Sequence, residues 1–299
     1  MITDAALAGL EREVQSALER ADASALRVLG YGEISLVLGW PSDEPRWACK
    51  RLPPFPSSAA ADGYVAVLGR YLDELGHRGV RVLDTEVGRV TLTDGVVALY
   101  VVQPVLPSDS LAISIVTRGD EQVPALLGDV VDAALGVVDD RVGLDAQLSN
   151  WAVHEDRLTY FDVTTPMLRG ADGSPELDTE VFLASLPRLL RGPVRRHLLP
   201  GILQRYHDPR SVVLDLAANL VKERLGSWIP TVLAAAGDRL EPALVEDEVR
   251  RDYRSDARTW ALLQALRRVD RAWQRRVRRR PYAFLLPDRI ERSGQARRA

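Results

Sequence analysis

Hydrophobic residues recur at helical spacing in three parts of the chain. Steps of three and four residues predict an amphipathic helix over the first twenty-odd residues, where Leu7, Leu10 and Val14 share one face. The same spacing returns over 59–75 and again over 122–138. We therefore expect helices at these three places.

Short apolar runs bounded by Gly, Pro, Asn or Asp predict strands between and after these helices. The predicted strands are 34–38, 46–52, 80–83, 89–93, 96–105, 151–153 and 158–161. Asp94-Gly95 marks a hairpin between two of them. Beyond Glu176 the helical pattern continues almost to the end of the sequence, with breaks that contain proline or glycine.

These patterns give a strand-rich first third that contains one helix, followed by a mainly helical remainder. No internal repeat is evident. The predicted class is α+β, with an N-terminal domain over 1–106 and a helical C-terminal domain over 107–299.

Composition is that of an ordinary globular protein. Hydrophobic residues make up 46% of the 299 residues and charged residues 27%, which excludes disordered and fibrous classes. No run approaches the roughly 20 apolar residues of a membrane span, and the first residues lack the pattern of a secretory leader. The one cysteine, Cys49, fits a reducing compartment. We expect a cytoplasmic protein with no membrane partner.

Basic residues are unusual in both kind and placement. Lys50 and Lys222 are the only lysines among 39 basic residues, and twelve arginines lie from Arg267 onward. A solvated helix end is the favoured interpretation of this arginine cluster. We expect no nucleic-acid partner, since no nucleic-acid motif accompanies the cluster, although the arginine-rich C-terminal helix could bind an anionic partner.

The first candidate motif contains Gly30, Gly32 and Ser35, directly before a strand that includes Val37. Glycines two apart let a backbone fold over phosphate without side-chain clashes. A dinucleotide-binding fingerprint would lead into a helix, and a Walker A loop would need Gly-Lys-Ser/Thr; the sequence has neither. A glycine loop over ATP in a β-hairpin remains, with an ordinary tight turn as the alternative.

The second motif is Trp47-Ala48-Cys49-Lys50, in the next predicted strand. Strand alternation puts Ala48 and Lys50 on one face and Cys49 on the other. The nucleotide-binding strand of kinases has the same arrangement. In it a small residue lies under adenine, and a lysine two positions later reaches the α- and β-phosphates. A solvated strand lysine is the alternative.

The third motif is Asp145, Asn150 after four intervening residues, and Asp162 after a predicted hairpin. Phosphoryl transfer needs a carboxylate that aligns the acceptor and metal ions that bridge the phosphates. Asp145 would orient the nucleophile or accept its proton, and Asn150 and Asp162 would offer oxygen ligands to Mg²⁺. Loop capping and a strand-end turn are the alternatives.

In this order and spacing, the three motifs resemble the protein-kinase-like superfamily, nearest to its aminoglycoside-phosphotransferase-like small-molecule kinases. The resemblance covers about 26–165 by motif. It implies a two-lobed fold, in which a small antiparallel sheet with one main helix faces a larger, mainly helical lobe, with ATP in the cleft. It also implies a hinge over 100–105, where the backbone at Gln103 and Val105 would pair with adenine.

Several positions depart from the family pattern. Gly143 stands where a histidine usually precedes the catalytic aspartate, and Gln147 where a lysine or histidine often follows it. Asp62 is the nearest candidate for the acidic helix partner of Lys50. No Ala-Pro-Glu or activation segment follows Asp162, which argues against a protein kinase and favours a small acceptor.

The resulting hypothesis is an ATP- and Mg²⁺-dependent phosphotransferase that transfers the γ-phosphate to the hydroxyl or amine of a small molecule. Acidic residues after the third motif could favour a cationic acceptor, with a solvated loop as the alternative; they are Asp172, Glu176, Asp178 and Glu180. Two other functions stay open at this point: a nucleotide-binding pseudokinase that acts as a scaffold, and a kinase-like enzyme that transfers AMP to protein. The choice between ATP and GTP and the oligomeric state are also open.

Overall fold

An antiparallel sheet of five strands forms the first part of the fold. The structure is a computed structural model that describes residues 2–20, 22–31, 36–183 and 188–254. The strands lie in the order β1-β2-β3-β5-β4, and each is antiparallel to its neighbours. Their bounds are β1 Val28–Tyr31, β2 Leu36–Trp40, β3 Trp47–Arg51, β4 Glu86–Thr91 and β5 Val97–Pro104.

Helices cover both faces of this sheet, which explains why β5 is an unbroken apolar run. Leu99 and its alternate neighbours pack in a core cluster that includes α2 (Ser58–His77). Tyr100 and its alternate neighbours pack in a second cluster with α1 (Asp4–Arg20). A strand buried on both faces has no place for the polar residues that alternate along a half-exposed strand.

A buried ion pair attaches α1 to the sheet. The Arg51 guanidinium on β3 donates two hydrogen bonds of 2.8 Å to the Glu11 carboxylate, and the two side chains are 7% and 2% exposed. The Tyr100 hydroxyl also donates to Glu11. At the other contact, a side chain at Gly88 of β4 would overlap Leu7, so glycine permits the close approach of α1.

Two parts of the strand prediction are wrong. Residues 80–83 form no strand, because the Leu83 amide and the Arg81 carbonyl both bond to the backbone of Tyr160, at 2.9 and 2.8 Å, and so make only an isolated bridge at Val82. Conversely, β1 was not predicted, and Gly30 lies within it. The predicted strand 34–38 is described only from residue 36 onward.

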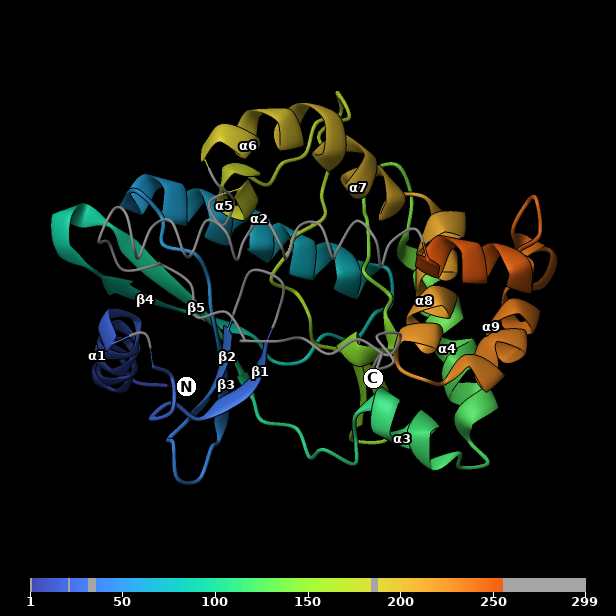
Figure 1. Ribbon diagram of the computed structural model, residues 1–299, viewed down its shortest axis with the longest axis horizontal. Helices are drawn as coiled ribbons and strands as arrows, with labels where there is room; N and C mark the ends of the chain where they lie inside the picture. Colours follow the sequence, from blue (N-terminus) through green and yellow to red (C-terminus); the bar gives the residue numbers. More distant parts are fainter. Residues whose placement is uncertain (1, 21, 32–35, 184–187, 255–299) are drawn as a thin grey trace, which may run out of the picture.

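The helical part follows β5. Its helices are α3 Ala112–Arg118, α4 Val123–Val137, α5 Glu180–Leu183, α6 Arg188–Pro193, α7 Leu199–Arg205, α8 Pro209–Lys222 and α9 Ile229–Ala236. Figure 1 shows α3, α4, α8 and α9 gathered at the end of the molecule away from β4, with α2 running from the sheet toward them. Helices α4, α8 and α9 pack on one another.

A short hairpin separates α4 from the later helices. Strands β6 (Trp151–His154) and β7 (Arg157–Tyr160) pair antiparallel, and Glu155 and Asp156 adopt positive φ values in the turn between them. A 3₁₀ turn, η2 (Leu148–Asn150), leads directly into β6. This hairpin carries the predicted Asn150 at its start and Asp162 just past its end.

The observed architecture, a small antiparallel sheet with a helical part, is mixed α and β as predicted. One core cluster contains residues from both parts, among them Leu68, Val101, Leu127 and Val213. The division between 106 and 107 stays a prediction.

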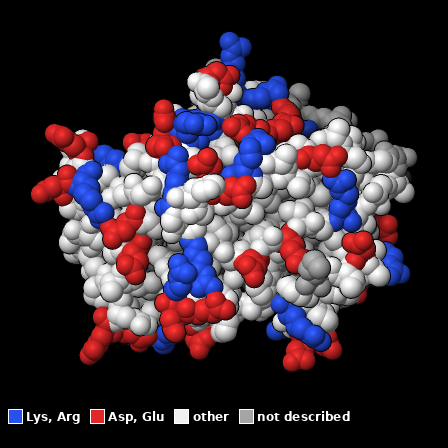
Figure 2. All heavy atoms as spheres, turned by 180° about the vertical axis from the view of Figure 1, so that it is seen from behind, with Lys and Arg blue, Asp and Glu red and all other residues white. Residues whose placement is uncertain are grey.

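The described surface carries charges of both signs. Figure 2 shows acidic and basic side chains interspersed over the face opposite to that of Figure 1. The arginine cluster from Arg267 onward lies outside the described residues. Among the described helices, none is long and apolar enough to cross a membrane.

Candidate active site

The sheet lysine and the mid-chain aspartate lie in direct contact. Lys50 Nζ is 3.2 Å from Asp162 Oδ1 and donates a 2.9 Å hydrogen bond to the Phe161 carbonyl. These residues are 112 and 111 positions apart in the sequence. The Lys50 side chain is 8% exposed and that of Asp162 39% exposed, so the pair sits at the edge of a buried region with the carboxylate toward solvent.

The strand register explains why Lys50 points to this side. Gly30 pairs with Val37, Val37 with Lys50, and Ala48 with Gln103. These predicted nucleotide-binding residues therefore lie in two rows of the sheet that are separated by the row of Cys49. Alternation then turns Lys50 away from α1, whereas its neighbour in β3, Cys49, packs in the cluster that contains α1.

The Asp162 carboxyl is held in its charged form. Burial would raise its pKa, but the charge of Lys50, the hydrogen bond from the Thr164 hydroxyl at 3.0 Å and the bond from Lys50 outweigh burial and lower the pKa below its ordinary value. A carboxylate that stays ionised is the form that binds a metal cation.

The backbone of Phe161 joins this pair to the third motif. Its carbonyl accepts from Lys50, and its amide donates to the Asn150 carbonyl at 3.0 Å. The Asn150 side-chain amide in turn donates to the Asp145 carbonyl at 3.1 Å. A continuous set of hydrogen bonds therefore links Lys50, Phe161, Asn150 and Asp145.

Asp145 begins a tight turn. The Gln147 amide donates to Asp145 Oδ1 at 3.2 Å, and the Asn150 amide donates to the Gln147 carbonyl at 2.9 Å. Short-range bonds of this kind fit the loop-capping alternative for Asp145. They also fix the direction of its carboxylate, which a proton acceptor requires.

Gln147 is anchored to α8 on the far side of this turn. Its side-chain amide donates to Asp215 Oδ2 at 3.0 Å, and its oxygen accepts from Asn219 at 3.1 Å. Because both ends of the amide are engaged with α8, Gln147 serves to hold the turn in place.

Gly143 allows a later histidine to lie against the backbone before Asp145. A Cβ at Gly143 would lie 2.8 Å from the Tyr206 carbonyl oxygen and 3.0 Å from His207 Cε1. The His207 ring is 6% exposed and its Nδ1 lies 2.9 Å from the Leu203 carbonyl. The space beside the residue two before Asp145 is thus filled by an imidazole from a segment more than sixty positions later.

Asn150 and Asp162 are a chemically suitable pair for a hard cation. Asn150 uses its nitrogen to bind the Asp145 carbonyl, which leaves the amide oxygen as the atom able to ligate. Mg²⁺ typically takes one or two protein oxygens and completes its octahedron with water and phosphate. Within the described ranges no three His, Cys, Asp or Glu side chains form a metal-binding group, so any metal here would depend on such additional ligands.

Comparison with known protein families gives one match. A family described as "Family of unknown function (DUF6206)" matches residues 9–271. The chain belongs to this family. The family description assigns no activity, so the chemistry of this DUF6206 protein has to be argued from its site. Comparison with the curated proteins gives no match.

Among solved structures, the chain is similar in part to one described as "WaaP in complex with acyl carrier protein". The identity is 17%, the match covers 71% of this chain and 92% of that chain, and the TM-score is 0.33.

The other residues predicted to contact the nucleotide either lie outside the described residues or have partners within the protein. Gly32 and Ser35 lie outside the described residues. The Gln103 side chain is buried and donates to Thr85 at 2.9 Å. The Val105 amide donates to the Arg46 carbonyl at 3.0 Å, so in this structure that donor extends the sheet and is not directed at a ligand.

Asp62 is not the partner of Lys50. It pairs with Arg89, and its side chain is 62% exposed. Helical geometry explains the correction, because Asp62 lies outside the buried face of α2, which includes Tyr64 and Leu68. The carboxylate beside Lys50 comes instead from Asp162.

The four acidic residues after the third motif have partners within the protein. Asp172 accepts from Ser174 at 2.6 Å, Asp178 caps the amide of Glu180 at 2.9 Å, Glu176 pairs with Arg70 at 2.6 Å and Glu180 pairs with Arg195. These contacts favour the solvated-loop interpretation over a binding site for a cationic acceptor.

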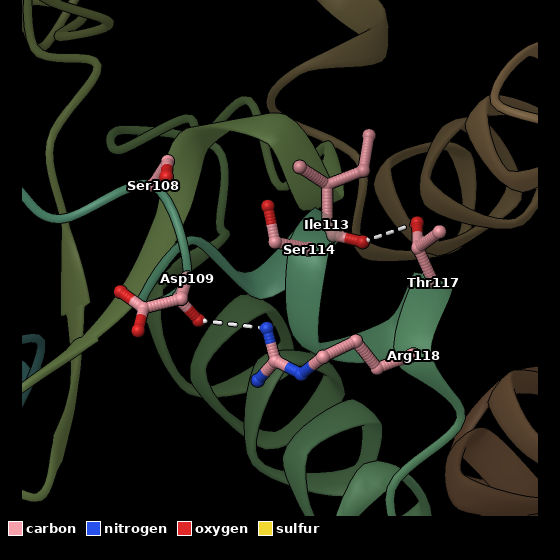
Figure 3. Close-up of a pocket in the computed structure, with 6 residues that line it drawn as sticks. All are labelled: Ser108, Asp109, Ile113, Ser114, Thr117 and Arg118. Atoms are coloured by element: carbon pink, nitrogen blue, oxygen red, sulfur yellow. Dashed lines mark hydrogen bonds between the residues drawn. The ribbon is translucent and has the colours of Figure 1, made fainter.

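A cavity of about 350 Å³ lies beside α3, away from these residues. Figure 3 shows its lining, which includes Ser108, Asp109, Thr117 and Arg118, with Arg118 bonded to the Asp109 carbonyl. No residue of the three motifs lines it. It is therefore separate from the candidate active site.

Sequence reasoning missed three residues that contact this site: Tyr64, Tyr71 and His207. All three act through contacts more than sixty positions away in the sequence. Tyr64 and Tyr71 carried one usable signal, since aromatic residues seven positions apart in a helix lie on one face. Nothing in the sequence indicates which groups the two tyrosine hydroxyls bind.

Proposed function

We propose that this protein is an ATP- and Mg²⁺-dependent phosphotransferase that acts on a small-molecule acceptor. The observation that carries the proposal is the hydrogen-bonded set from Lys50 through Phe161 and Asn150 to Asp145, with Asp162 ion-paired to Lys50. It links three separate segments that carry one ammonium, two carboxylates and one amide, with Asp145 joined through its main-chain carbonyl. That group is the minimum that phosphoryl transfer asks of a protein.

In the proposed reaction each residue has one task. Lys50 binds the α- and β-phosphates, and Asn150 and Asp162 hold Mg²⁺, which neutralises charge on the phosphates when bound. Asp145 takes the proton from the acceptor hydroxyl or amine as a new bond to the γ-phosphorus forms. The bond between the γ-phosphorus and the bridging oxygen breaks, and ADP leaves with that electron pair.

The sheet would hold the nucleoside in this proposal. Ala48 and Gln103 lie side by side in one row, and Gly30, Val37 and Lys50 lie in another row, beyond that of Cys49. The loop with Gly32 and Ser35 would cover the phosphates, and the Val105 amide would have to exchange its bond with Arg46 for one with adenine.

The test is a metabolite-library reaction with Mg-ATP, read by mass spectrometry for a gain of one phosphate. Wild type should phosphorylate at least one compound, and Asp145→Asn should lower kcat by about 10²- to 10⁴-fold, the range for loss of a general base. Mg-ATP should still raise the melting temperature of Asp145→Asn, because a ligand that binds only the folded state stabilises it.

The two lysines of the chain provide a matched control. Lys50→Met should abolish the stabilisation by Mg-ATP. Lys222→Met should retain it, because Lys222 lies at the end of α8 beside Glu223. Equal Mg-ATP stabilisation of wild type and Lys50→Met would contradict the proposal.

One observation favours a second function, a nucleotide-binding pseudokinase. Gln147 is neutral and both ends of its amide bind α8, so this position offers no cation to the transferring phosphate. A pseudokinase would give the Lys50-dependent stabilisation by Mg-ATP with no phosphorylated product from any compound. The same two measurements therefore separate the two functions.

A further inference from the structure

Two tyrosines on one face of α2 reach the backbone of the candidate active site. Tyr64 and Tyr71 are seven positions apart, so about two turns separate them and their side chains leave the same face of the helix. The Tyr64 hydroxyl donates to the Thr164 carbonyl and the Tyr71 hydroxyl donates to the Gly143 carbonyl, each at 3.0 Å. One rigid helix therefore contacts two segments that are distant in the sequence.

Each of the two carbonyls belongs to a residue two positions away from one of the two aspartates. Thr164 follows Asp162 by two residues, and Gly143 precedes Asp145 by two residues. A hydrogen bond two residues from a side chain restricts the backbone that carries it. The two tyrosines thus restrain the metal-binding segment and the catalytic segment separately.

Burial makes these hydrogen bonds difficult to replace. Tyr64 is 5% exposed and Tyr71 0%, so water cannot readily take over either bond, and a buried carbonyl left without a donor is costly. Burial, and then the negative charges of Asp145 and Asp162, raise the pKa of Tyr71, and burial and Asp162 raise that of Tyr64. Both hydroxyls therefore stay protonated and remain donors.

Of the three acidic residues of α2, two pair with arginines and the third, Asp73, is exposed. Asp62 pairs with Arg89 and Glu74 pairs with Arg78, while the carboxylate that contacts Lys50 in the described chain is Asp162. The link between α2 and the reaction centre is therefore not one of these carboxylates.

We propose that Tyr64 and Tyr71 are that link, positioning residues that hold the Asp162 and Asp145 segments against α2 through their hydroxyl groups. The inference rests on the proposed function for its catalytic consequences, but the restraint itself can be measured without catalysis. Each tyrosine restrains one segment. We therefore expect loss of the Tyr71 hydroxyl to affect the rate of transfer and loss of the Tyr64 hydroxyl to affect metal binding.

The experiment compares Tyr64→Phe and Tyr71→Phe in the full chain. Tyr71→Phe should lower kcat by about 10- to 100-fold with the KM for ATP within about twofold, because a small displacement of a reacting group costs rate more than binding. Tyr64→Phe should raise the Mg²⁺ concentration for half-maximal activity by about 10-fold, the lower range for loss of a residue that supports a metal ligand.

Tyr100→Phe is the matched control. Tyr100 is also fully buried and also loses a hydroxyl bond, to Glu11, but it lies on the α1 face of the sheet. It should leave amide exchange in both active-site segments as in wild type, because its hydroxyl bond lies on the other face of the sheet.

Hydrogen exchange provides the readout that does not depend on activity. Amides over 143–150 should exchange faster in Tyr71→Phe, and those over 162–165 faster in Tyr64→Phe, with neither segment changed in Tyr100→Phe. If wild type transfers no phosphate, the proposed function fails and the exchange pattern alone decides this inference. Equal exchange in all three variants, or a kcat of Tyr71→Phe equal to that of wild type, would overturn it.

Discussion

At the scale of single residues, Gly143 has a structural explanation that does not involve loss of function. A side chain there would overlap the Tyr206 carbonyl and approach the His207 ring. The Gly143 amide donates to the Met167 carbonyl and the Leu144 amide donates to the Tyr206 carbonyl, at 2.8 and 3.1 Å. The segment before Asp145 is therefore held tightly from two sides, and only glycine leaves room for both contacts.

Gly143→Ala should lower the free energy of unfolding by about 1–3 kcal/mol, the usual cost of overpacking a core position. It should also lower activity, because the displaced backbone carries Asp145 two residues later. Urea unfolding measures the first effect.

Gly69→Ala is the control for this substitution. Gly69 lies on the exposed side of α2 with nothing within 4 Å of a Cβ, so alanine there should stabilise the helix by about 0.5–1 kcal/mol. A Gly143→Ala variant as stable as Gly69→Ala would contradict the packing argument.

At the scale of elements, α1 is attached to the sheet in a way that depends on one charge pair. Glu11 accepts from Arg51, Tyr100 and Gln15. Burial raises the pKa of Glu11, but these bonds and the charge of Arg51 outweigh it, and the pKa lies below the ordinary value of 4.5. A folded-state pKa below the unfolded value means that the contribution to stability is present above about pH 4.5 and is lost as pH falls through the folded pKa.

Glu11→Gln should therefore lower the free energy of unfolding at pH 7 by about 3–5 kcal/mol, because the Arg51 charge stays buried without its partner. The difference from wild type should shrink as the pH falls through the folded-state pKa of Glu11, since wild type then loses the same charge. Denaturant unfolding over a pH series checks both statements. A difference that is constant with pH would show that the charge of Glu11 is not what stabilises the contact.

At the scale of the whole molecule, one core cluster joins the sheet, α2 and the helical part. Arg78 at the end of α2 adds a polar link, since it donates to the Val137 carbonyl at 2.8 Å and to Asp139 at 2.7 Å. Helix α2 thus belongs to the packing of both parts, so we expect them to unfold together.

Leu68→Ala tests this expectation, because Leu68 is 1% exposed in that cluster. It should lower the free energy of unfolding by about 2–5 kcal/mol. The midpoints from far-ultraviolet circular dichroism and from tryptophan fluorescence should move together. Two separated transitions would show instead that the parts on either side of residue 106 unfold independently.

The sequence by itself determined most helices and strands and the identity of the candidate site. The apolar run of β5, the spacing in α2 and the order of Lys50, Asp145, Asn150 and Asp162 are all local patterns, and local periodicity and turn chemistry decide elements of this kind. The failure at 80–83 shows the limit of such patterns: the Leu83 amide and the Arg81 carbonyl bond to the backbone of Tyr160, a partner that no local window contains.

Only the tertiary structure decided which side chains meet. Lys50 could have paired with Asp62 by proximity in sequence, yet it contacts Asp162, because strand alternation and the return of the chain after β7 bring those two groups to one face. The Tyr64 and Tyr71 hydroxyls and the ring of His207 find their partners in the same way, through chain segments brought together by the shared core. Contacts of this kind follow from the packing of whole elements, which is why the site residues were visible in the sequence and their supports were not.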